Sequence, residues 1–487
     1  MEFKRTGANT IYTKEGLLIW IGAVFVLGIL SSLNFVLPIA FLVFFGLFYY
    51  INQVRLAPGL AIKTLFLCAC FISGITRILP LPLGLSIDGL LLLTWLVLFF
   101  TGFEGANWKL KNNSLTLCLG LWMLFCVLQL LNPQVRSYLA WFYAVRSLAM
   151  NGGLLAPLLF LAFNKKKDLS FFINFWFLVS IFMGIYGAKQ YFIGVFAFEQ
   201  HWLNGEGGIT HVLFGRFTRM FSFMSDANAF GCFQAYTALV ATIMLFGERN
   251  WKKIIFYSIT AGISFFGMFI SGTRTAIIIP VVGFAVFMVL SKNYKLLALG
   301  SIVGGVMFYI LAYTFILHSV EPIRRMRTAF NPTEDESFQV RLENRRALEV
   351  YLADKPFGGG IGSAGVWGKR FSPGNFLANF ETDGHYTRIK AETGFVGLTI
   401  YLTLYGFILL KMCLICFKLK DPVIKYTMIG FTSAVFGCMA ANYTNPVILG
   451  LPLSIIVVIN MAFVYMSQKW NMGEEYPDFL ILKNKNE

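Results

Sequence analysis

Four polar stretches of this sequence combine residue types that could bind an anion and move a proton. Arginine offers a planar fork of N–H donors that matches a phosphate or a carboxylate bidentately, while histidine and carboxylates can accept a proton. Each stretch adjoins a long apolar run. The stretches are GRFTRMFSFMSDANAFG (215–231), FISGTRTAIIIP (269–280), SFQVRLENRRALEVYLADKPFGGGIG (337–362) and ETDGHYTRIKAETGFVGL (381–398).

The first two stretches place arginines at the ends of apolar runs. Arg216 and Arg219 precede a run that opens with Asp226 and Asn228, two residue types that cap helix N-termini. Capping does not explain two arginines so close to the membrane. Arg274 is almost enclosed by apolar sequence, where an ionisable residue is costly and marks a candidate functional site. The alternative is that its long side chain reaches back to the interface.

The third stretch predicts a helix over about 337–353, which a proline and several glycines end. Arg341 and Arg345 are one turn apart on one face of that helix, so together they could grip one diphosphate. They could equally pair with Glu343 and Glu349 of the same helix.

The fourth stretch crowds titratable side chains at the start of an apolar run. Asp383 and His385 are the candidates to carry a proton, although Asp383 could instead cap the following helix. Glu392 falls one to two turns inside the run, where an unpaired carboxylate is expensive. We therefore expect an arginine from another loop to neutralise Glu392.

The sequence predicts no metal ion and no cofactor. All eight cysteines fall inside apolar runs, which supports neither a disulfide framework nor a zinc site. The glycine pattern GIGSAG at 360–365 lacks the preceding strand that a dinucleotide-binding motif requires, so we interpret it as a tight turn near the membrane. A nucleic-acid partner is not expected either.

The elements that must position these residues are membrane-spanning helices. The chain is 57% hydrophobic and only 13% charged, and apolar runs of about 20 residues recur throughout. The fold class is therefore an all-α polytopic membrane protein with about 14 transmembrane helices and one large, partly helical periplasmic loop. The predicted spans are 16–31, 33–51, 59–79, 83–102, 113–131, 147–163, 169–193, 226–246, 253–270, 275–290, 296–317, 389–417, 426–442 and 447–467.

The distribution of lysine predicts the topology. Lysines concentrate in alternate short loops and at both termini, which places those loops and both termini in the cytoplasm. Most arginines then lie on the outer face, against this bias, so an anion site or Arg–Glu pairing must explain them. The predicted regions are N-terminal helices at 1–193, a periplasmic loop at 194–225, central helices at 226–317, a large periplasmic loop at 318–388, C-terminal helices at 389–467 and a cytoplasmic tail at 468–487.

In this order the four stretches resemble the O-antigen ligase and O-antigen polymerase superfamily of bacterial membrane glycosyltransferases. The stretch from Arg219 to Asn228 is similar to the family's Arg-x-x-Gly…Asp-Pro-Asn, with Ser222 in place of the glycine and Ala227 in place of the proline. Ser271-Gly-Thr-Arg274 is similar to the family's Ser-x-Ser-Arg turn. Arg341 is similar to the arginine that opens the helix of its large periplasmic loop.

The last family motif is His-Asn-x-Tyr-Leu-x4-Glu-x-Gly-x-x-Gly. Aligned on Glu392 and the two glycines after it, the family histidine falls on Asp383, and Tyr386 falls on the family tyrosine. His385 lies two residues beyond the histidine position. In the ligases that histidine is thought to assist removal of the acceptor proton, so its replacement argues against lipid A-core ligation and towards a polymerase.

The resemblance implies transfer of a glycan from polyprenyl (undecaprenyl) pyrophosphate to a sugar hydroxyl, without a metal, at the periplasmic face of the bacterial inner membrane. Arg219, Arg274 and Arg341 would bind the pyrophosphate together with Arg216 and Arg345, while Glu392 and Asp226 would support them. The expected partners are the carrier-linked oligosaccharide, membrane lipid and a chain-length regulator.

Three functions compete on these grounds. The first is a polymerase of polysaccharide repeat units, as in lipopolysaccharide or exopolysaccharide synthesis. The second is an O-antigen ligase or a protein O-oligosaccharyltransferase, which differs in its acceptor. The third is a transporter or flippase of lipid-linked sugars. A transporter places charged groups at mid-membrane in broken helices, whereas the middles of these predicted spans are nearly free of charge.

Overall fold

The computed structural model describes residues 36–78, 83–100, 113–205, 213–214, 217–293, 309, 336–380, 382 and 384–471. The predicted span at 16–31 lies outside these residues, and so does the span at 296–317 apart from Tyr309. Arg216 and Asp383 also lie outside them, and the side chain of Arg341 is not described.

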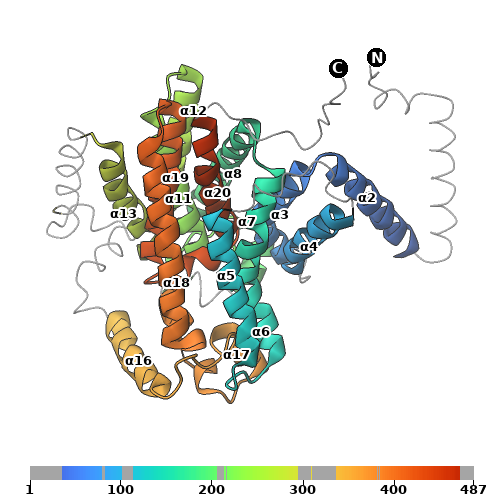
Figure 1. The fold of residues 1–487 in the computed structure, drawn as a ribbon, viewed down its shortest axis with the longest axis vertical. Coiled ribbons are helices and arrows are strands. Elements are labelled where there is room, and N and C mark those ends of the chain that lie inside the picture. Colours follow the sequence, from blue (N-terminus) through green and yellow to red (C-terminus); the bar gives the residue numbers. More distant parts are fainter. Residues whose placement is uncertain are drawn as a thin grey trace.

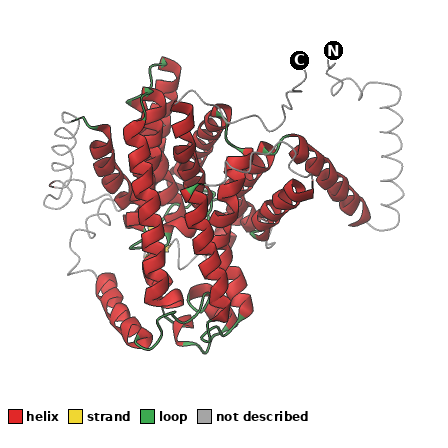
Figure 2. Cartoon of the chain, viewed as in Figure 1, coloured by secondary structure: helices red, strands yellow, loops and turns green. Residues whose placement is uncertain are grey.

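Helices make up nearly all of the described chain (Figures 1 and 2). Within it, ten helices are long and apolar enough to cross a membrane, which confirms an all-helical, multi-pass protein, while the total of 14 stays a prediction. The longer helices are α2 (Val36–Leu56), α3 (Gly59–Ile78), α4 (Leu85–Phe100), α5 (Ser114–Leu128), α7 (Asn151–Ala162), α8 (Lys166–Phe192), α11 (Ala227–Leu245), α12 (Trp251–Ile270), α13 (Arg274–Ser291), α16 (Glu336–Leu352), α18 (His385–Lys418), α19 (Pro422–Ala441) and α20 (Leu453–Asn471).

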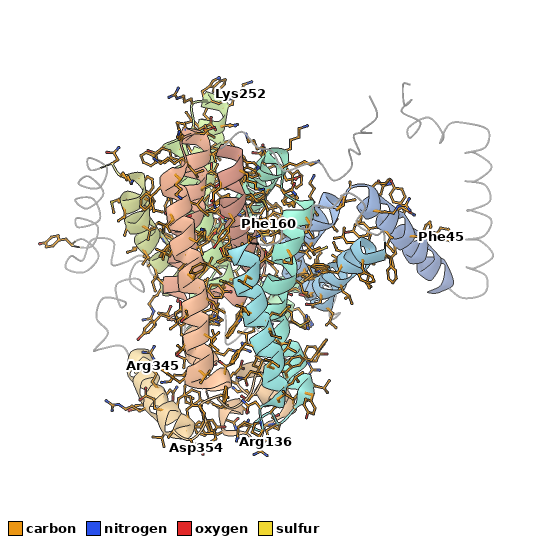
Figure 3. All side chains as sticks on the ribbon, viewed as in Figure 1. Phe45, Arg136, Phe160, Lys252, Arg345 and Asp354 are labelled. Atoms are coloured by element: carbon orange, nitrogen blue, oxygen red, sulfur yellow. The ribbon has the colours of Figure 1, made fainter. Side chains whose placement is uncertain are left out.

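The shorter elements lie at the ends of these helices. They are α6 (Tyr138–Val145), α9 (Ala197–Leu203), α17 (Gly365–Phe371), a ribbon of β1 (Leu213–Phe214) against β2 (Phe217–Thr218), the 3-10 turns Gln129–Leu131, Phe376–Ala378 and Val447–Leu449, and a π-helical turn Arg146–Met150. In Figure 3, Arg136, Arg345 and Asp354 lie at one end of the bundle, which we call the loop end, and Lys252 lies at the opposite end.

One predicted span begins earlier than expected. The span placed at 147–163 is a single apolar helical stretch, Tyr138–Ala162, which runs through α6, the π-helical turn and α7. We began the predicted span after Arg146 because a charge inside an apolar helix is costly. The structure pairs Arg146 with Asp88 of α4, so the helix continues past it.

The centre of the bundle is formed by α11 and α20. Buried residues make up 78% of the apolar stretch of α11 and 83% of that of α20, against 28% for α18, which lies at the periphery. Polar groups in this core are paired between helices, as an apolar environment requires. Trp176 donates to Thr237 at 3.0 Å, and Asn460 donates to the hydroxyl of Tyr236 at 2.8 Å.

The helix predicted over about 337–353 is confirmed as α16, at the loop end beside the start of α18 (Figure 1). The helix α18 has 34 residues and is kinked at Gly394, whose φ is +71°. At about 1.5 Å per residue it is longer than the apolar part of a bilayer, so part of it projects beyond the membrane.

Candidate functional site

Arg219 is attached to the turn between α12 and α13, residues 271–273, which we call the hairpin turn. Its Nε donates to the carbonyl of Ser271 at 3.3 Å, and its Nη2 donates to Oγ1 of Thr273 at 2.6 Å. Because α12 starts beside Lys252, its other end and the hairpin turn lie towards the loop end (Figure 3). Two stretches far apart in sequence thus form one unit.

Arg274 begins α13 directly after the hairpin turn, so two arginines converge there. Burial lowers the pKa of Arg219; the negative charge of Asp226 raises it, and the neighbouring charge of Arg274 lowers it. Asp226 caps α11, since its Oδ1 accepts the backbone N–H of Ala229 at 2.9 Å, as predicted. Arg219 therefore has both a carboxylate and a second guanidinium group nearby.

The loop between α19 and the turn Val447–Leu449, residues 442–446, connects this unit to α16. Thr444 is 3.0 Å from Thr275 through their hydroxyls, and Asn445 donates to the same Thr275 hydroxyl at 2.6 Å. On the other side, Arg345 of α16 hydrogen-bonds the hydroxyl of Tyr443 and lies 4.4 Å from its ring. The 442–446 loop therefore links the arginines of α13 and α16.

Sequence reasoning missed the 442–446 loop. Its sequence, NYTNP, lies between two apolar runs and looks like an ordinary polar connection with a proline. The available signal was its density of hydrogen-bonding side chains, four in succession, on the face where the arginines were placed. Such a connection between spans needs only one or two polar residues to turn the chain.

His385 starts α18 but does not face solvent. Its side chain is 1% exposed, and its Nε2 lies 3.1 Å from the hydroxyl of Tyr401. Its backbone N–H donates to the carbonyl of Asn442 at 2.8 Å, so the 442–446 loop also anchors this helix start. The ring borders an internal cavity of about 30 Å³, which is large enough to hold water.

Glu392 is fully buried and pairs with Arg388, whose Nε lies 3.3 Å from its Oε1. We expected an arginine from another loop, but among the described residues the partner lies four residues earlier on the same helix. That spacing brings the two side chains together on one helix face. The other oxygen of Glu392, Oε2, accepts no hydrogen bond of ordinary geometry from a described residue.

The glycine-rich segment 356–365, the glycine loop, covers Glu392. Gly359 and Gly360 donate their N–H groups to the carbonyls of Ala391 and Glu392, each at 2.9 Å. Gly358 has a φ of +76°, and a Cβ there would lie 2.4 Å from the backbone nitrogen of Gly394. Only glycine allows so close an approach. Within the motif at 360–365, Gly360 and Gly362 also have positive φ, +89° and +84°, which confirms the interpretation of this motif as a tight turn.

A second cluster of polar side chains holds Ser222, three residues after Arg219. It consists of Arg77, Tyr186, Gln190, Glu199 and Ser222, and we call it the clamp. Arg77 donates to the carbonyl of Ser222 at 2.8 Å and lies over the adjacent rings of Trp202 and Phe221, at 4.5 and 4.4 Å from their centres. Gln190 accepts the N–H of Ser222 at 2.7 Å and donates to Glu199 at 2.6 Å.

Ser222 stands where the resembled family has glycine, and the structure shows why that position favours glycine. Its φ is +50°, a left-handed conformation that costs a residue with a side chain about 1–2 kcal/mol. The clamp binds both its N–H and its carbonyl, and its hydroxyl donates to the carbonyl of Met183 at 2.7 Å. These bonds hold the strained turn in place.

The structure thus brings several predicted residues together and leaves others untested. Arg219, Arg274 and Asp226 form one group, and the 442–446 loop links it to Arg345 and to His385. Within the described residues, no three His, Cys, Asp or Glu side chains gather in a way that could hold a metal ion.

Comparison with known families identifies the segment that carries most of this site. No curated protein matches the chain. Residues 259–402, however, match the family described as O-antigen ligase. The matched segment runs from α12 to α18 and includes Arg274, Arg345, His385 and Glu392. This match supports the predicted relation of residues 259–402 to the O-antigen ligase and polymerase superfamily, whose members are membrane glycosyltransferase-like enzymes.

Proposed function

We propose that the protein is a polymerase of polysaccharide repeat units that uses a polyprenyl-pyrophosphate-linked glycan at the periplasmic face of the inner membrane. The observation that carries this proposal is that a series of contacts connects arginines from three separate stretches. Arg219 is bound to the turn that precedes Arg274, and the 442–446 loop ties α13 to Arg345. A lipid diphosphate is the kind of anion that several guanidinium groups hold best.

In the proposed reaction, the acceptor hydroxyl oxygen forms a bond to the anomeric carbon of the donor sugar. The bond from that carbon to the diphosphate oxygen breaks, and the diphosphate leaves with the electron pair. Arg219, Arg274 and Arg341 would stabilise the charge that develops on it, with Arg216 and Arg345 in support. Guanidinium groups supply fixed positive charge, so this scheme requires no metal ion.

The acceptor proton would pass to Asp383 or His385. His385 is buried beside Tyr401, so in this scheme a proton reaches it only through the small cavity or through a shift of the helix start. Asp383 occupies the position of the family histidine. Asp383→Asn and His385→Ala, assayed separately, distinguish the two, since only the loss of the proton acceptor abolishes transfer.

The proposal is tested in a deletion strain that expresses Arg274→Ala or Arg341→Ala. Either variant should yield single-repeat glycan instead of a ladder of chain lengths. Arg249→Ala is the matched control, because Arg249 is exposed in the loop before α12, at the end of the bundle away from the proposed site. Normal ladders from both test variants at normal expression would contradict the proposal.

A ligase is the second candidate, and the description of the matched family favours it. Replacement of the family histidine by Asp383 favours the polymerase instead. The acceptor separates the two functions. A strain without a ligase keeps long chains on the carrier lipid, whereas a strain without a polymerase loses them, so the same gels decide between the candidates.

A further inference from the structure

A groove of about 580 Å³ opens at the loop end, apart from the converging arginines. It lies between the connection from α5 to α6, the C-terminal end of α16 and the segment 371–376. The side chains that matter for its chemistry are Arg136, Tyr351, Lys355, Phe371, Asn375 and Phe376. The glycosyl-transfer proposal gives no role to any of them.

Stacked aromatic rings form two walls of the groove. Tyr351 stacks on Phe376 with ring centres 4.7 Å apart, and Phe371 stacks on Tyr143 of α6 at 5.6 Å. Phe376 is nevertheless 46% exposed. Fixed aromatic faces beside amide and hydroxyl groups suit a ligand with both C–H faces and hydroxyl edges, since each part finds its partner. Sugars have this composition.

The charge of the groove is positive. Arg136 and Lys355 line it, and none of its lining residues is acidic. Lys355 pairs with Asp354, which lies outside the lining, while Arg136 forms no ion pair with a described residue. Lys369 and Arg370 of α17 are exposed just before Phe371. A carboxylate on a bound sugar could therefore pair with Arg136, while it would share Lys355 with Asp354.

The helix α16 connects the groove to the arginine cluster. Arg345 and Tyr351 lie on the same helix, six residues apart, which corresponds to about 9 Å along the axis. A glycan whose reacting end is at the arginines could therefore extend along α16 into the groove.

We propose that this groove binds acidic oligosaccharide, and that it holds part of a glycan chain away from the reacting bond. Its binding chemistry comes from the groove alone, while its role in chain growth rests on the proposed function. The groove gives the chain a second attachment point, so a glycan stays bound between successive transfers.

The test measures binding without transfer. Purified full-length protein in detergent is titrated with an acidic oligosaccharide, hexagalacturonate, and with a neutral one, maltohexaose, by calorimetry. We expect the acidic ligand to bind more tightly. Phe376→Ala should weaken its binding by about tenfold, which corresponds to about 1.4 kcal/mol, because it removes an exposed aromatic face of the groove. Arg136→Gln should weaken the acidic ligand selectively, and Arg249→Gln, at the opposite end, is the control.

Three results would overturn the inference: no binding of the acidic ligand, equal binding of both ligands, or unchanged binding by Phe376→Ala and Arg136→Gln. A thermal unfolding measurement shows whether each variant is folded. Arg274→Ala separates this inference from the proposed function, because it should lose chain growth and keep oligosaccharide binding. If the oligosaccharide binds but both Arg274→Ala and Arg341→Ala give normal ladders, only the polymerase proposal is contradicted. If the ladder is lost but no oligosaccharide binds, only the proposal for the groove is contradicted.

Discussion

Glu199 and Glu392 are both fully buried, one in the clamp and one beneath the glycine loop, but they are held differently. Glu199 accepts hydrogen bonds from the hydroxyl of Tyr186 at 3.1 Å, the amide of Gln190 at 2.6 Å and the N–H of Phe196 at 2.9 Å. Glu392 has its ion pair with Arg388, while its second oxygen accepts no hydrogen bond of ordinary geometry from a described residue.

This difference suggests a structural role for Glu199 and a functional role for Glu392. A buried carboxylate whose acceptor positions are used stabilises the fold and has little left to give a ligand. The backbone N–H groups of Gly362 and Ala364 also stabilise the charge of Glu392, and its partner Arg388 is partly exposed. We infer that the clamp fixes the position of Arg219, whereas the Glu392 pair can respond when a charged substrate arrives. Each of the following predictions tests one side of this comparison.

The largest effect is expected from Glu199→Ala. It removes the acceptor of the Tyr186 hydroxyl and the shorter of the two acceptors of the Gln190 amide, together with a negative charge that stabilises Arg77, so the free energy of unfolding should fall by about 3–5 kcal/mol. Thermal unfolding of the purified protein measures this loss. Glu199→Gln keeps the shape and one acceptor oxygen, and should lose less. An unchanged unfolding temperature in Glu199→Ala would show that the clamp is not structural.

Glu392→Gln should reduce transfer activity more than it reduces stability. It preserves volume but removes the charge that Arg388 faces, so an interaction of about 1.5–3 kcal/mol is weakened and transfer should slow by about 10- to 100-fold. The unfolding temperature should fall less than in Glu199→Ala. Chain growth in isolated membranes and thermal unfolding are measured side by side. A variant that unfolds early but transfers normally would reverse the comparison.

Ser222 tests how firmly the clamp holds a strained backbone. Ser222→Val should destabilise the protein by about 2–3 kcal/mol, because a branched residue disfavours a positive φ and the hydrogen bond to Met183 is lost. Ser222→Gly relieves the strain while losing the same bond, so it should stay within about 1 kcal/mol of the parent protein. Both are measured by thermal unfolding. Equal losses in the two variants would mean that backbone strain is unimportant here.

The smallest effect is expected from Tyr443→Phe. It removes the hydroxyl that Arg345 binds but keeps the ring on which the guanidinium lies, so transfer should slow only by about two- to fivefold. Tyr443→Ala removes both contacts and should slow transfer further. If the two variants behave alike, the ring and not the hydroxyl positions Arg345.

The sequence predicted much of the fold because the length of a single apolar run is enough to place a membrane-spanning helix. Twelve of the 14 predicted spans coincide with described helices, and the loop helix at α16 lies where its periodicity placed it. The Arg388–Glu392 pair was also within reach, since a spacing of four residues on a helix implies contact. We missed it because we looked for a partner on another loop.

Other parts of the site were not predictable from local pattern. The sequence around Arg77 and the sequence around Glu199 contain no pattern that indicates which residue each one contacts. The 442–446 loop lies outside the stretches that attracted attention, yet it contacts α13, α16 and α18. Contacts of this kind depend on the angles and positions at which helices pack, and these cannot be derived from the sequence of a single helix.

The amino-acid sequence by itself determined that the chain is a helical membrane protein, where most of its helices lie and which arginines are worth testing. Hydrophobic length and charge cost act within about 20 residues, so they can be recognised in one segment. Only the tertiary structure decided that Arg219 is bound at the hairpin turn, that His385 is buried and that Glu392 is paired within its own helix. Burial and hydrogen-bond satisfaction depend on all neighbours at once, and those neighbours come from distant segments.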